Sequence, residues 1–377
     1  MEFTKPHIDE ITNNNNIMTF EIEDVNVAYV NSIRRTILSD IPVCVFRTTP
    51  HKDNKVNIIS NTSRFNNEII KQRFSCIPIH ISDINNTPYN NYSIELSIKN
   101  DTNDVLVVTT ENFKIKDITT DTYIDQSEVK KIFPPYISPD KTEHYIDIIR
   151  LRPKISENID GEEIDISALI DIGTAKQEGM YNVVSTCTFN NIIDTDRARE
   201  EWDKIRSEKY ANIKDGDEEL SSLRDNFELL DAQRFYKKDK FKFKLETLGI
   251  FSNKDIIKRT CQIIKFQLDK IKNLEKNTIE ISNSDNTMNN SYDITLFNKD
   301  YTIGKLLEYE FYNNYFEIED KIINYVSFYK KHPHDTDGIL RVAFIEETTL
   351  DKLKVYIQNI TNIIDLKFEE IKTDILR

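Results

Sequence analysis

The chain has 377 residues and a formal net charge of −14 at pH 7, with 64 acidic against 50 basic side chains. This length allows two or three domains of ordinary size, each with its own core. The acidic balance argues against a protein whose main task is to bind nucleic-acid phosphates, because that affinity comes from clustered Lys and Arg.

The first regular pattern follows a lead, residues 1–17, that ends near a run of Asn and is expected to be flexible. Three elements are predicted next: a strand at 18–24, a helix at 26–39 and a strand at 41–47. Pro42 cannot continue the helix. Within the helix, Val30, Ile33 and Ile37 recur at three- and four-residue spacing, which predicts one apolar face.

The middle of the chain changes pattern twice. Residues 49–190 contain short alternating runs divided by Asn, Asp and Pro clusters, which predicts an inserted β-rich domain. Residues 191–235 are strongly charged and helix-permissive, which predicts an exposed helix or a mobile connector. The first module would therefore consist of residues 18–48 and 236–275, separated by the insertion and the connector.

Clear periodicity returns after the connector. Phe241, Phe243 and Leu245 alternate with charged residues, which predicts a half-buried strand. The helix expected at 253–275 carries apolar residues at spacings of four and three, so it should pack against another helix. Its core-facing residues are Ile257, Cys261, Ile264 and Leu268.

A polar linker is predicted at 276–290, and residues 291–377 then repeat the earlier order of elements. The predicted elements are a strand at 292–297, a helix at 301–311, strands near 321–330 and 338–346, and a long helix that opens near Thr348. The apolar residues expected on the core faces of the two helices are Ile303, Leu306, Leu307, Leu353, Ile357, Ile360 and Ile364.

Each copy of this repeat ends in a long helix whose apolar stripe has no partner within the copy. Burying one Leu or Ile side chain is worth about 1.5–3 kcal/mol, so the copies should pack on each other. We therefore expect an α+β fold in which two strand-and-helix modules pair within one chain through a four-helix interface. The β-rich domain is inserted in the first module.

Several stretches resemble the alpha-type assembly subunits of multisubunit DNA-dependent RNA polymerases. FEIEDVNVAYVNSIRRTILSDIPV (20–43), NTSRFNNEIIKQRFSCIPI (61–79) and GTAKQEGMYNVVSTCTF (173–189) are similar to the third-subunit (archaeal D) type. DYTIGKLL (300–307) and YKKHPH (329–334) are similar to the eleventh-subunit (archaeal L) type. Their order resembles the fusion found in polymerases of large cytoplasmic DNA viruses. The abundance of Asn and Ile suits this source, because we interpret it as the codon bias of an A/T-rich genome.

The resemblance implies a non-catalytic scaffold that nucleates polymerase assembly. Its first copy would bind the second-largest subunit and its second copy would be directed toward the largest. Small zinc-binding subunits would be further partners, DNA would be reached only through the complex, and no membrane is involved. The implied location is intracellular, in the host cytoplasm and the virion if the source is viral. The residues implied to bind partners are Asn31, Arg34, Arg35, Asn61, Thr62, Ser63, Glu68 and Arg73.

These residues also have structural interpretations. Arg34 and Arg35 alone would be interpreted as a solvated helix face, and only the flanking matches favour a partner. The triplet at 61–63 fits a glycosylation acceptor, but the N-terminus lacks an apolar signal segment, which disfavours that interpretation.

No metal or cofactor is predicted. The four cysteines form no Cys-x-x-Cys pair, which favours a reducing setting. Cys76 and His80 have a spacing that could bind metal, but two residues do not complete a four-ligand site, and a buried thiol is favoured. The insertion of many relatives carries a cysteine cluster, whereas residues 49–190 contain only Cys76 and Cys187.

Two other classes of protein compete with the scaffold. A metal-dependent hydrolase would use the Asp pairs at 194–196 and 335–337 with His332 or His334, but turn chemistry explains the Asp pairs. No GxSxG, phosphate-binding loop or acidic triplet occurs. An unrelated coiled-coil-like adaptor would be almost all helix and would need no β-rich insertion.

Overall fold

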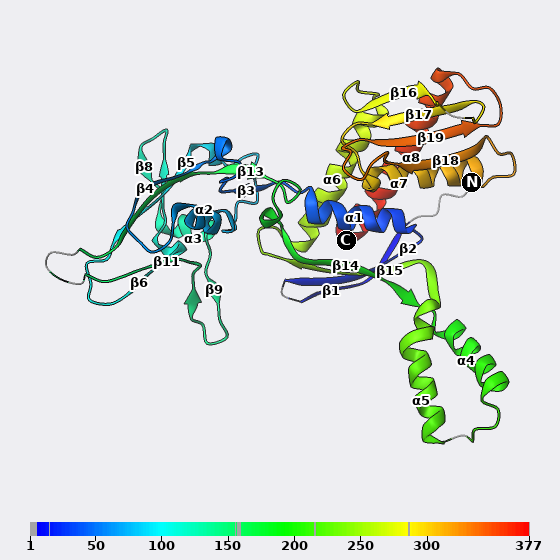
Figure 1. The fold of residues 1–377 in the computed structure, drawn as a ribbon, viewed down its shortest axis with the longest axis horizontal. Helices are drawn as coiled ribbons and strands as arrows, with labels where there is room; N and C mark the ends of the chain where they lie inside the picture. The colour runs from blue at the N-terminus through cyan, green and yellow to red at the C-terminus, as the bar shows by residue number, and fades with distance from the viewer. Residues whose placement is uncertain are drawn as a thin grey trace. The chain divides into compact units, whose positions relative to one another are not determined.

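The computed structural model describes residues 6–14, 16–154, 156, 160–214, 216–285 and 287–376 (Figure 1). The chain divides into two compact units. Unit 1 consists of residues 1–36, 186–246 and 253–377, and unit 2 consists of residues 37–185 and 247–252. Unit 1 contains most of both copies of the repeat, and unit 2 contains most of the insertion.

The first sheet of unit 1 has four strands in the order β1-β2-β15-β14. The elements of this first copy are β1 (His7–Asn14), β2 (Ile17–Glu23), α1 (Val27–Ser39), β14 (Val184–Ile193), β15 (Tyr236–Thr247) and α6 (Asn253–Lys272). In β15, Phe241, Phe243 and Leu245 are buried and alternate with lysines, and the strand pairs antiparallel with β2. Phe20 of β2 stacks on Phe243 with ring centroids 4.8 Å apart, so one face of the sheet forms core.

The second sheet of unit 1 repeats this arrangement in the order β16-β17-β19-β18. Its copy consists of β16 (Ile279–Asn283), β17 (Ser291–Leu296), α7 (Tyr301–Phe311), β18 (Ile323–Tyr329), β19 (Gly338–Phe344) and α8 (Leu350–Leu376). Each strand takes the sheet position of its counterpart in the first copy, and the helices follow corresponding strands. The predicted α+β fold built from two modules is therefore confirmed.

Two segments that were predicted to be irregular are strands. β1 lies in the predicted lead 1–17 and β16 in the predicted linker 276–290, and both occupy the same edge position of their sheets. Residues 1–5, 15 and 286 lie outside the described residues. The prediction failed because an edge strand pairs on one side only and can be polar on one face, so its apolar signal is weak.

The insertion begins and ends earlier than the predicted range 49–190. β3 (Val43–Val45), predicted as the third strand of the first module, instead pairs with β13 (Asp171–Gly173) in unit 2. The corresponding place in the first sheet belongs to β14. An apolar alternating pattern identifies a strand but does not identify its partner, which explains the error.

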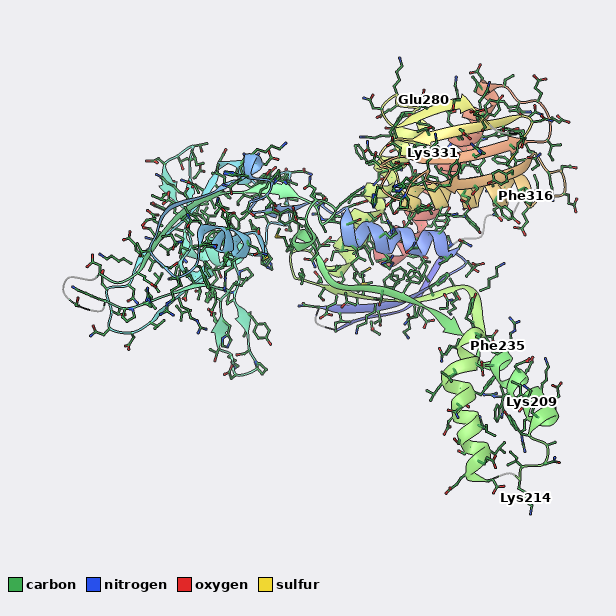
Figure 2. The ribbon with its side chains drawn as sticks, in the orientation of Figure 1. Lys209, Lys214, Phe235, Glu280, Phe316 and Lys331 are labelled. Atoms are coloured by element: carbon green, nitrogen blue, oxygen red, sulfur yellow. The ribbon has the colours of Figure 1, made fainter. Side chains whose placement is uncertain are left out.

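Residues 191–235 include a helical hairpin between β14 and β15. It consists of α4 (Thr195–Lys209), α5 (Glu218–Asn226) and a π-helical turn (Phe227–Asp231). Trp202 and Phe227 pack with ring centroids 5.4 Å apart and form a small core with Ala198, Leu220 and Ala232. The Asp194 N–H donates to the Phe235 carbonyl at 2.9 Å and closes the base of the hairpin. Figure 2 labels Phe235 at this base, with Lys209 and Lys214 farther along the hairpin.

Unit 2 is built on a five-stranded sheet in the order β4-β12-β5-β7-β8. Over its described residues it also contains three two-stranded sheets, β11-β6, β10-β9 and β13-β3. Its remaining elements are β4 (Val56–Asn61), α2 (Asn67–Ser75), β5 (Tyr92–Lys99), β6 (Leu106–Thr109), β7 (Lys114–Asp117), β8 (Thr122–Tyr123), α3 (Gln126–Ile132), β9 (Tyr136–Ile137), β10 (Glu143–His144), β11 (Asp147–Leu151) and β12 (Glu163–Leu169). Four aromatic rings pack together in its core: Phe46, Phe74, Phe113 and Phe133.

Helices α6 and α8, one from each copy, pack against each other in opposite directions. Lys265 Nζ lies 2.6 Å from Asp365 Oδ2, and Gln358 Nε2 donates to the Lys272 carbonyl at 3.3 Å. The residue numbers therefore increase along α6 while those of their partners decrease along α8. All fourteen apolar residues predicted for the interface are buried. We call the contact region of α1, α6, α7 and α8 the helix seam.

A buried charge pair lies where α1, α7 and α8 meet. Glu310 of α7 is 0 % exposed, and its Oε1 accepts from the Tyr29 hydroxyl at 2.6 Å and from Lys367 Nζ at 2.7 Å. Asn314 Nδ2 donates to the other carboxylate oxygen at 2.8 Å. Burial, and then the nearby Glu310 charge, raise the pKa of Tyr29 well above its ordinary value, so the hydroxyl stays a donor. One partner in this network comes from the first copy and the others come from the second.

Replacing Ile264 by Ala should lower the free energy of unfolding by about 2–5 kcal/mol, because a cavity would remain in the helix seam. The control, Phe266→Ala, removes a larger side chain from the same helix, but that side chain is 62 % exposed, and the loss should stay below about 1 kcal/mol. Urea denaturation followed by circular dichroism measures both. Equal losses would show that the seam is not a core.

Lys367→Met should lower the free energy of unfolding by about 3–5 kcal/mol, since Glu310 would remain buried without its cation. The double variant Lys367→Met with Glu310→Leu should regain most of that loss, because neither charge is then buried. A double-mutant cycle by urea denaturation measures the coupling. A single variant as stable as the wild type would contradict the charge pair.

Candidate partner-docking surfaces

Helix α1 carries the first group of predicted partner-binding residues. The helix begins after Asn26, whose Oδ1 accepts the Ala28 N–H at 2.9 Å. Asn31 and Arg34 lie one turn apart on a half-buried face, and Arg34 donates through Nε and Nη2 to Asn31 Oδ1 at 3.1 and 2.9 Å. The two side chains are therefore held as a pair, and the guanidinium keeps further donors for another group.

Arg35 has a different environment from Arg34. Its Nη2 lies 2.6 Å from Asp300 Oδ2 and its Nε donates to Thr302 Oγ1 at 2.7 Å, so it joins α1 to the start of α7 in the other copy. Burial raises the pKa of Asp300, but hydrogen bonds from Thr302 and Arg35 outweigh burial and leave this pKa below its ordinary value. No local pattern indicated this bridge, although Asp300 occupies the helix-capping position of α7 that Asn26 occupies in α1.

A pocket of about 350 Å³ lies beside Asn31 and is shared by the two copies. Its lining residues are Asn26, Val27, Ala28, Asn31, Lys305, Glu308, Tyr309, Tyr312 and Val326. Val27 and Tyr312 are exposed, while Glu308 is held by Lys305 and by the Phe328 N–H at 2.6 Å. Sequence reasoning did not find the α7 side of this surface, because Lys305 and Glu308 are spaced like an ordinary ion pair of a solvated helix face.

The loop Asn61–Ser63 carries the second group of predicted residues, and it belongs to unit 2. Asn61 Oδ1 accepts from the Ser63 N–H at 3.0 Å and from the Ser63 hydroxyl at 2.6 Å, while its Nδ2 donates to the Phe65 carbonyl at 2.8 Å. Thr62 Oγ1 accepts the Glu163 N–H at 2.8 Å, which ties the loop to β12. The loop is therefore an Asx-type turn with a fixed shape.

Glu68 and Arg73 lie on α2, next to this loop in sequence. Glu68 is exposed in the first turn of the helix, which suits its negative charge. Arg73 donates to the Asp147 carbonyl at 2.9 Å and lies over the Phe65 ring, 5.5 Å from its centroid. The structure thus brings Arg73 to Phe65, which follows the loop by two residues.

The cysteines of the described residues lie in separate environments. Cys76 is exposed, so the prediction of a buried thiol is wrong, and its Sγ lies 3.9 Å from Met180 Sδ. Burial raises the pKa of Cys187 to about 12, so it stays a thiol and a poor metal ligand. Over the described residues, no group of three or more His, Cys, Asp or Glu could hold a metal ion. No helix in the described part of the chain is long and apolar enough to cross a membrane.

The residues that a hydrolase would use form local contacts in a turn. Asp335 Oδ2 accepts the His332 N–H at 2.9 Å, and His332 Nδ1 accepts the His334 N–H at 3.1 Å. Asp337 Oδ1 accepts the Asn298 N–H at 2.8 Å. The first two contacts lie within the connection between β18 and β19, the third joins this connection to the one between β17 and α7, and none of them brings a nucleophile to the histidines.

Paired modules with a β-rich unit inserted after the first helix are the arrangement expected of an alpha-type subunit. Residues 19–268, more than half of the chain, match the RNA polymerase Rpb3/Rpb11 dimerisation domain. The chain belongs to this family. The matched range ends within α6, so the second copy lies outside it.

Individual relatives are similar over most of their own length. The chain is 24 % identical over 274 residues to the DNA-directed RNA polymerase subunit Rpo3 of Methanosphaera stadtmanae, covering 67 % of this chain and 93 % of that protein. It is 23 % identical over 306 residues to the DNA-directed RNA polymerase II subunit rpb3 of Dictyostelium discoideum, covering 71 % and 94 %. A conjugation stage-specific protein of Tetrahymena thermophila is 22 % identical over 292 residues, covering 66 % and 88 %.

Asp300→Asn keeps an oxygen that can cap α7 but removes the charge that binds Arg35. The variant should lower the free energy of unfolding at pH 7 by about 1 kcal/mol or less, because the ion pair is partly exposed. The pKa of Asp300 is lower in the folded chain, so its ionised form stabilises the fold above the ordinary pKa of 3.8 and that stabilisation disappears as the pH falls through the folded pKa. The gap between variant and wild type should therefore shrink below pH 4, as urea denaturation at several pH values measures. A gap that widens in acid would contradict this linkage.

Proposed function

We propose that this chain is a non-catalytic scaffold subunit of a multisubunit DNA-dependent RNA polymerase, which nucleates assembly by pairing its two copies and docking the two largest subunits. The observation that carries the proposal is the repeated module, with equivalent strand orders in two sheets and a buried helix seam between the copies. Membership of the dimerisation-domain family supports it, and two of the similar proteins are RNA polymerase subunits by name.

Within this proposal the chain is a fusion of a third-type and an eleventh-type subunit. The family match ends at residue 268, and the second copy that follows has the topology of the first. Only residues 273–278 separate α6 from β16. A connection this short gives the two copies a high effective concentration, so that pairing needs no encounter between separate chains. A viral source, with the host cytoplasm and virion as its location, stays a prediction.

The first copy would dock the second-largest subunit through Asn31 and Arg34, and the second copy would be directed toward the largest. Side chains already held by hydrogen bonds suit this task, because they lose little freedom on binding. Arg35 would contribute through the 40 % of its side chain that is exposed. Small zinc-binding subunits are further implied partners, and DNA would be reached only through the complex.

Unit 2 would add a second contact with the second-largest subunit. The loop Asn61–Ser63 has a fixed shape, and Glu68 and Arg73 follow it on α2. A preorganised loop beside a charged helix provides both shape and charge for recognition.

The alternative of a coiled-coil adaptor that is almost all helix is wrong, because both units are built on sheets. The hydrolase alternative finds no support in the described residues, since Asp335 and Asp337 accept backbone N–H groups at and near the turn between β18 and β19, and Asp194 caps α4. The scaffold is therefore the function that the geometry favours.

Affinity purification of the tagged chain from the cells that produce it should recover the two largest RNA polymerase subunits. Arg34→Glu should reduce recovery of the second-largest subunit at least about tenfold, because a charged hydrogen bond is worth about 1.5–3 kcal/mol and the reversed charge would also repel the partner. Arg34 is preferable to Arg35, since a glutamate at position 35 would face Asp300.

The matched control is Lys258→Glu, which makes the same reversal at an exposed site on α6 and should leave recovery unchanged. Circular dichroism of the purified variants tests that both remain folded. Undiminished recovery of the second-largest subunit with Arg34→Glu would contradict the assigned surface, and the absence of both large subunits from the wild-type preparation would contradict the function.

A further inference from the structure

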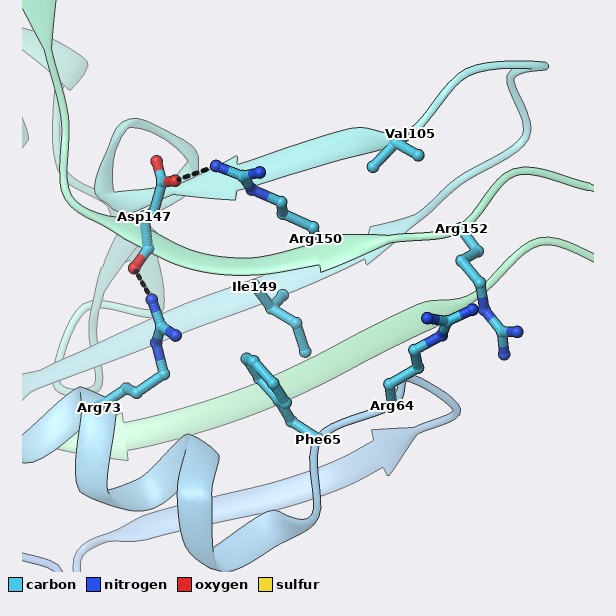
Figure 3. Close-up of a pocket in the computed structure, with 8 residues that line it drawn as sticks. All are labelled: Arg64, Phe65, Arg73, Val105, Asp147, Ile149, Arg150 and Arg152. Atoms are coloured by element: carbon cyan, nitrogen blue, oxygen red, sulfur yellow. Dashed lines mark hydrogen bonds and ion pairs between the residues drawn. The ribbon is translucent and has the colours of Figure 1, made fainter.

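Unit 2 contains a basic cavity of about 640 Å³ that sequence reasoning did not find (Figure 3). Its lining residues are Arg64, Phe65, Arg73, Val105, Asp147, Ile149, Arg150 and Arg152. They come from the loop after β4, from α2, from the residue before β6 and from β11 with its continuation. Figure 3 shows Arg64 and Arg152 at one end, Arg73 and Asp147 at the other, and Phe65 and Ile149 between them.

The arginines keep hydrogen-bond donors for a ligand. Arg64 is exposed, and within the described part of the chain no hydrogen bond or ion pair engages its guanidinium. Arg152 uses Nε on the buried Glu162, and Arg150 uses one nitrogen on Asp147 at 3.3 Å while its side chain is 70 % exposed. Because each guanidinium has five N–H donors, most donors around the cavity remain for an incoming anion.

Apolar side chains also line the cavity. Phe65 and Ile149, half-buried and buried, lie between its ends, and Val105, drawn toward the end with Arg152, is 57 % exposed (Figure 3). Exposed apolar surface beside arginines favours a ligand that carries both carboxylates and hydrophobic side chains. The whole chain is acidic, whereas four arginines and one aspartate line this cavity. The charge of the cavity lining is therefore opposite in sign to that of the chain.

We propose that this cavity binds an extended acidic peptide segment whose carboxylates contact Arg64, Arg150 and Arg152 and whose apolar side chains contact Val105 and Ile149. The inference rests on the proposed function in that the segment belongs to another subunit of the same assembly. Arginine matches a carboxylate with two parallel hydrogen bonds, which gives such a site geometric specificity as well as charge.

The same observations disfavour a nucleic acid as the ligand. Arg73 already covers one face of the Phe65 ring, and the ring is half-buried, so less aromatic surface remains on which a base could stack. A cavity for a phosphate backbone would also have little use for Val105.

The first experiment places the photo-reactive amino acid p-benzoylphenylalanine at position 105 of the tagged full chain. After irradiation of the purified assembly, mass spectrometry should identify a cross-link to a segment of another subunit that is rich in Asp and Glu. A cross-link to nucleic acid, to a segment without acidic residues, or to no other molecule would overturn the proposal. If the large subunits co-purify in those cases, the proposed function stands while this inference fails.

The second experiment uses the cross-linked segment as a fluorescein-labelled synthetic peptide with the full chain, measured by fluorescence anisotropy. Arg64→Glu should weaken binding at least about tenfold, since it replaces a charged donor with a repelling group. A peptide with each Asp and Glu replaced by Asn and Gln should weaken by at least the same factor. The matched control, Lys114→Glu, reverses a charge at an exposed site of the same unit and should stay within about twofold of wild type. Equal affinity of the acidic and neutral peptides would overturn the proposal.

Discussion

Unit 1 depends on one constraint, which is that the apolar stripes of α6 and α8 are buried where these two helices, one from each copy, pack together. Each copy has a four-stranded sheet and two helices, and the sheet alone leaves one stripe uncovered on its long helix. Pairing the copies buries both stripes at once and aligns the helices in opposite directions. The outer face of α1 and its neighbour α7 then form a surface to which both copies contribute.

The buried pair of Glu310 and Lys367 restricts how the helices of the two copies can be aligned. Apolar stripes alone tolerate a shift of one helix along another, whereas a fully buried carboxylate needs its donors at one place. Tyr29 supplies one of those donors from the first copy, and Arg35 adds a second bridge between the copies at Asp300. We interpret these polar contacts as the feature that fixes how the two copies meet, while the apolar side chains supply most of the stability.

Long amphipathic helices were the most predictable part of this chain, because a stripe such as Leu353, Ile357, Ile360 and Ile364 is determined by local spacing. The edge strands were missed since their pairing is one-sided, and the partner of β3 was missed because partner choice is a property of the whole fold. The charge pair had a signal that was not used. Glu310 follows Leu306 by four residues and Lys367 follows Ile364 by three, so both charges lie on apolar stripes.

The proposed docking residues show the same division. The resemblance of short motifs indicated Asn31, Arg34, Arg35 and the loop at 61–63, whereas the bridge that Arg35 makes joins residues 265 positions apart. The basic cavity of unit 2 is also assembled from separate segments. No periodic pattern in the sequence links Arg64 to Arg152, so the sequence does not predict this cavity. Pattern reasoning therefore finds elements and short motifs, and it cannot find sites that tertiary packing creates.

The order of the two copies along the chain has a consequence for biosynthesis. Lys265 and Asp365 are 100 residues apart in sequence, so α6 leaves the ribosome well before the helix that covers it exists. During that interval the apolar face of α6 would be exposed and could bind chaperones or aggregate. Contacts between residues so far apart in sequence also form slowly. Translation speed through the second copy is therefore expected to influence how much of the protein reaches its native state.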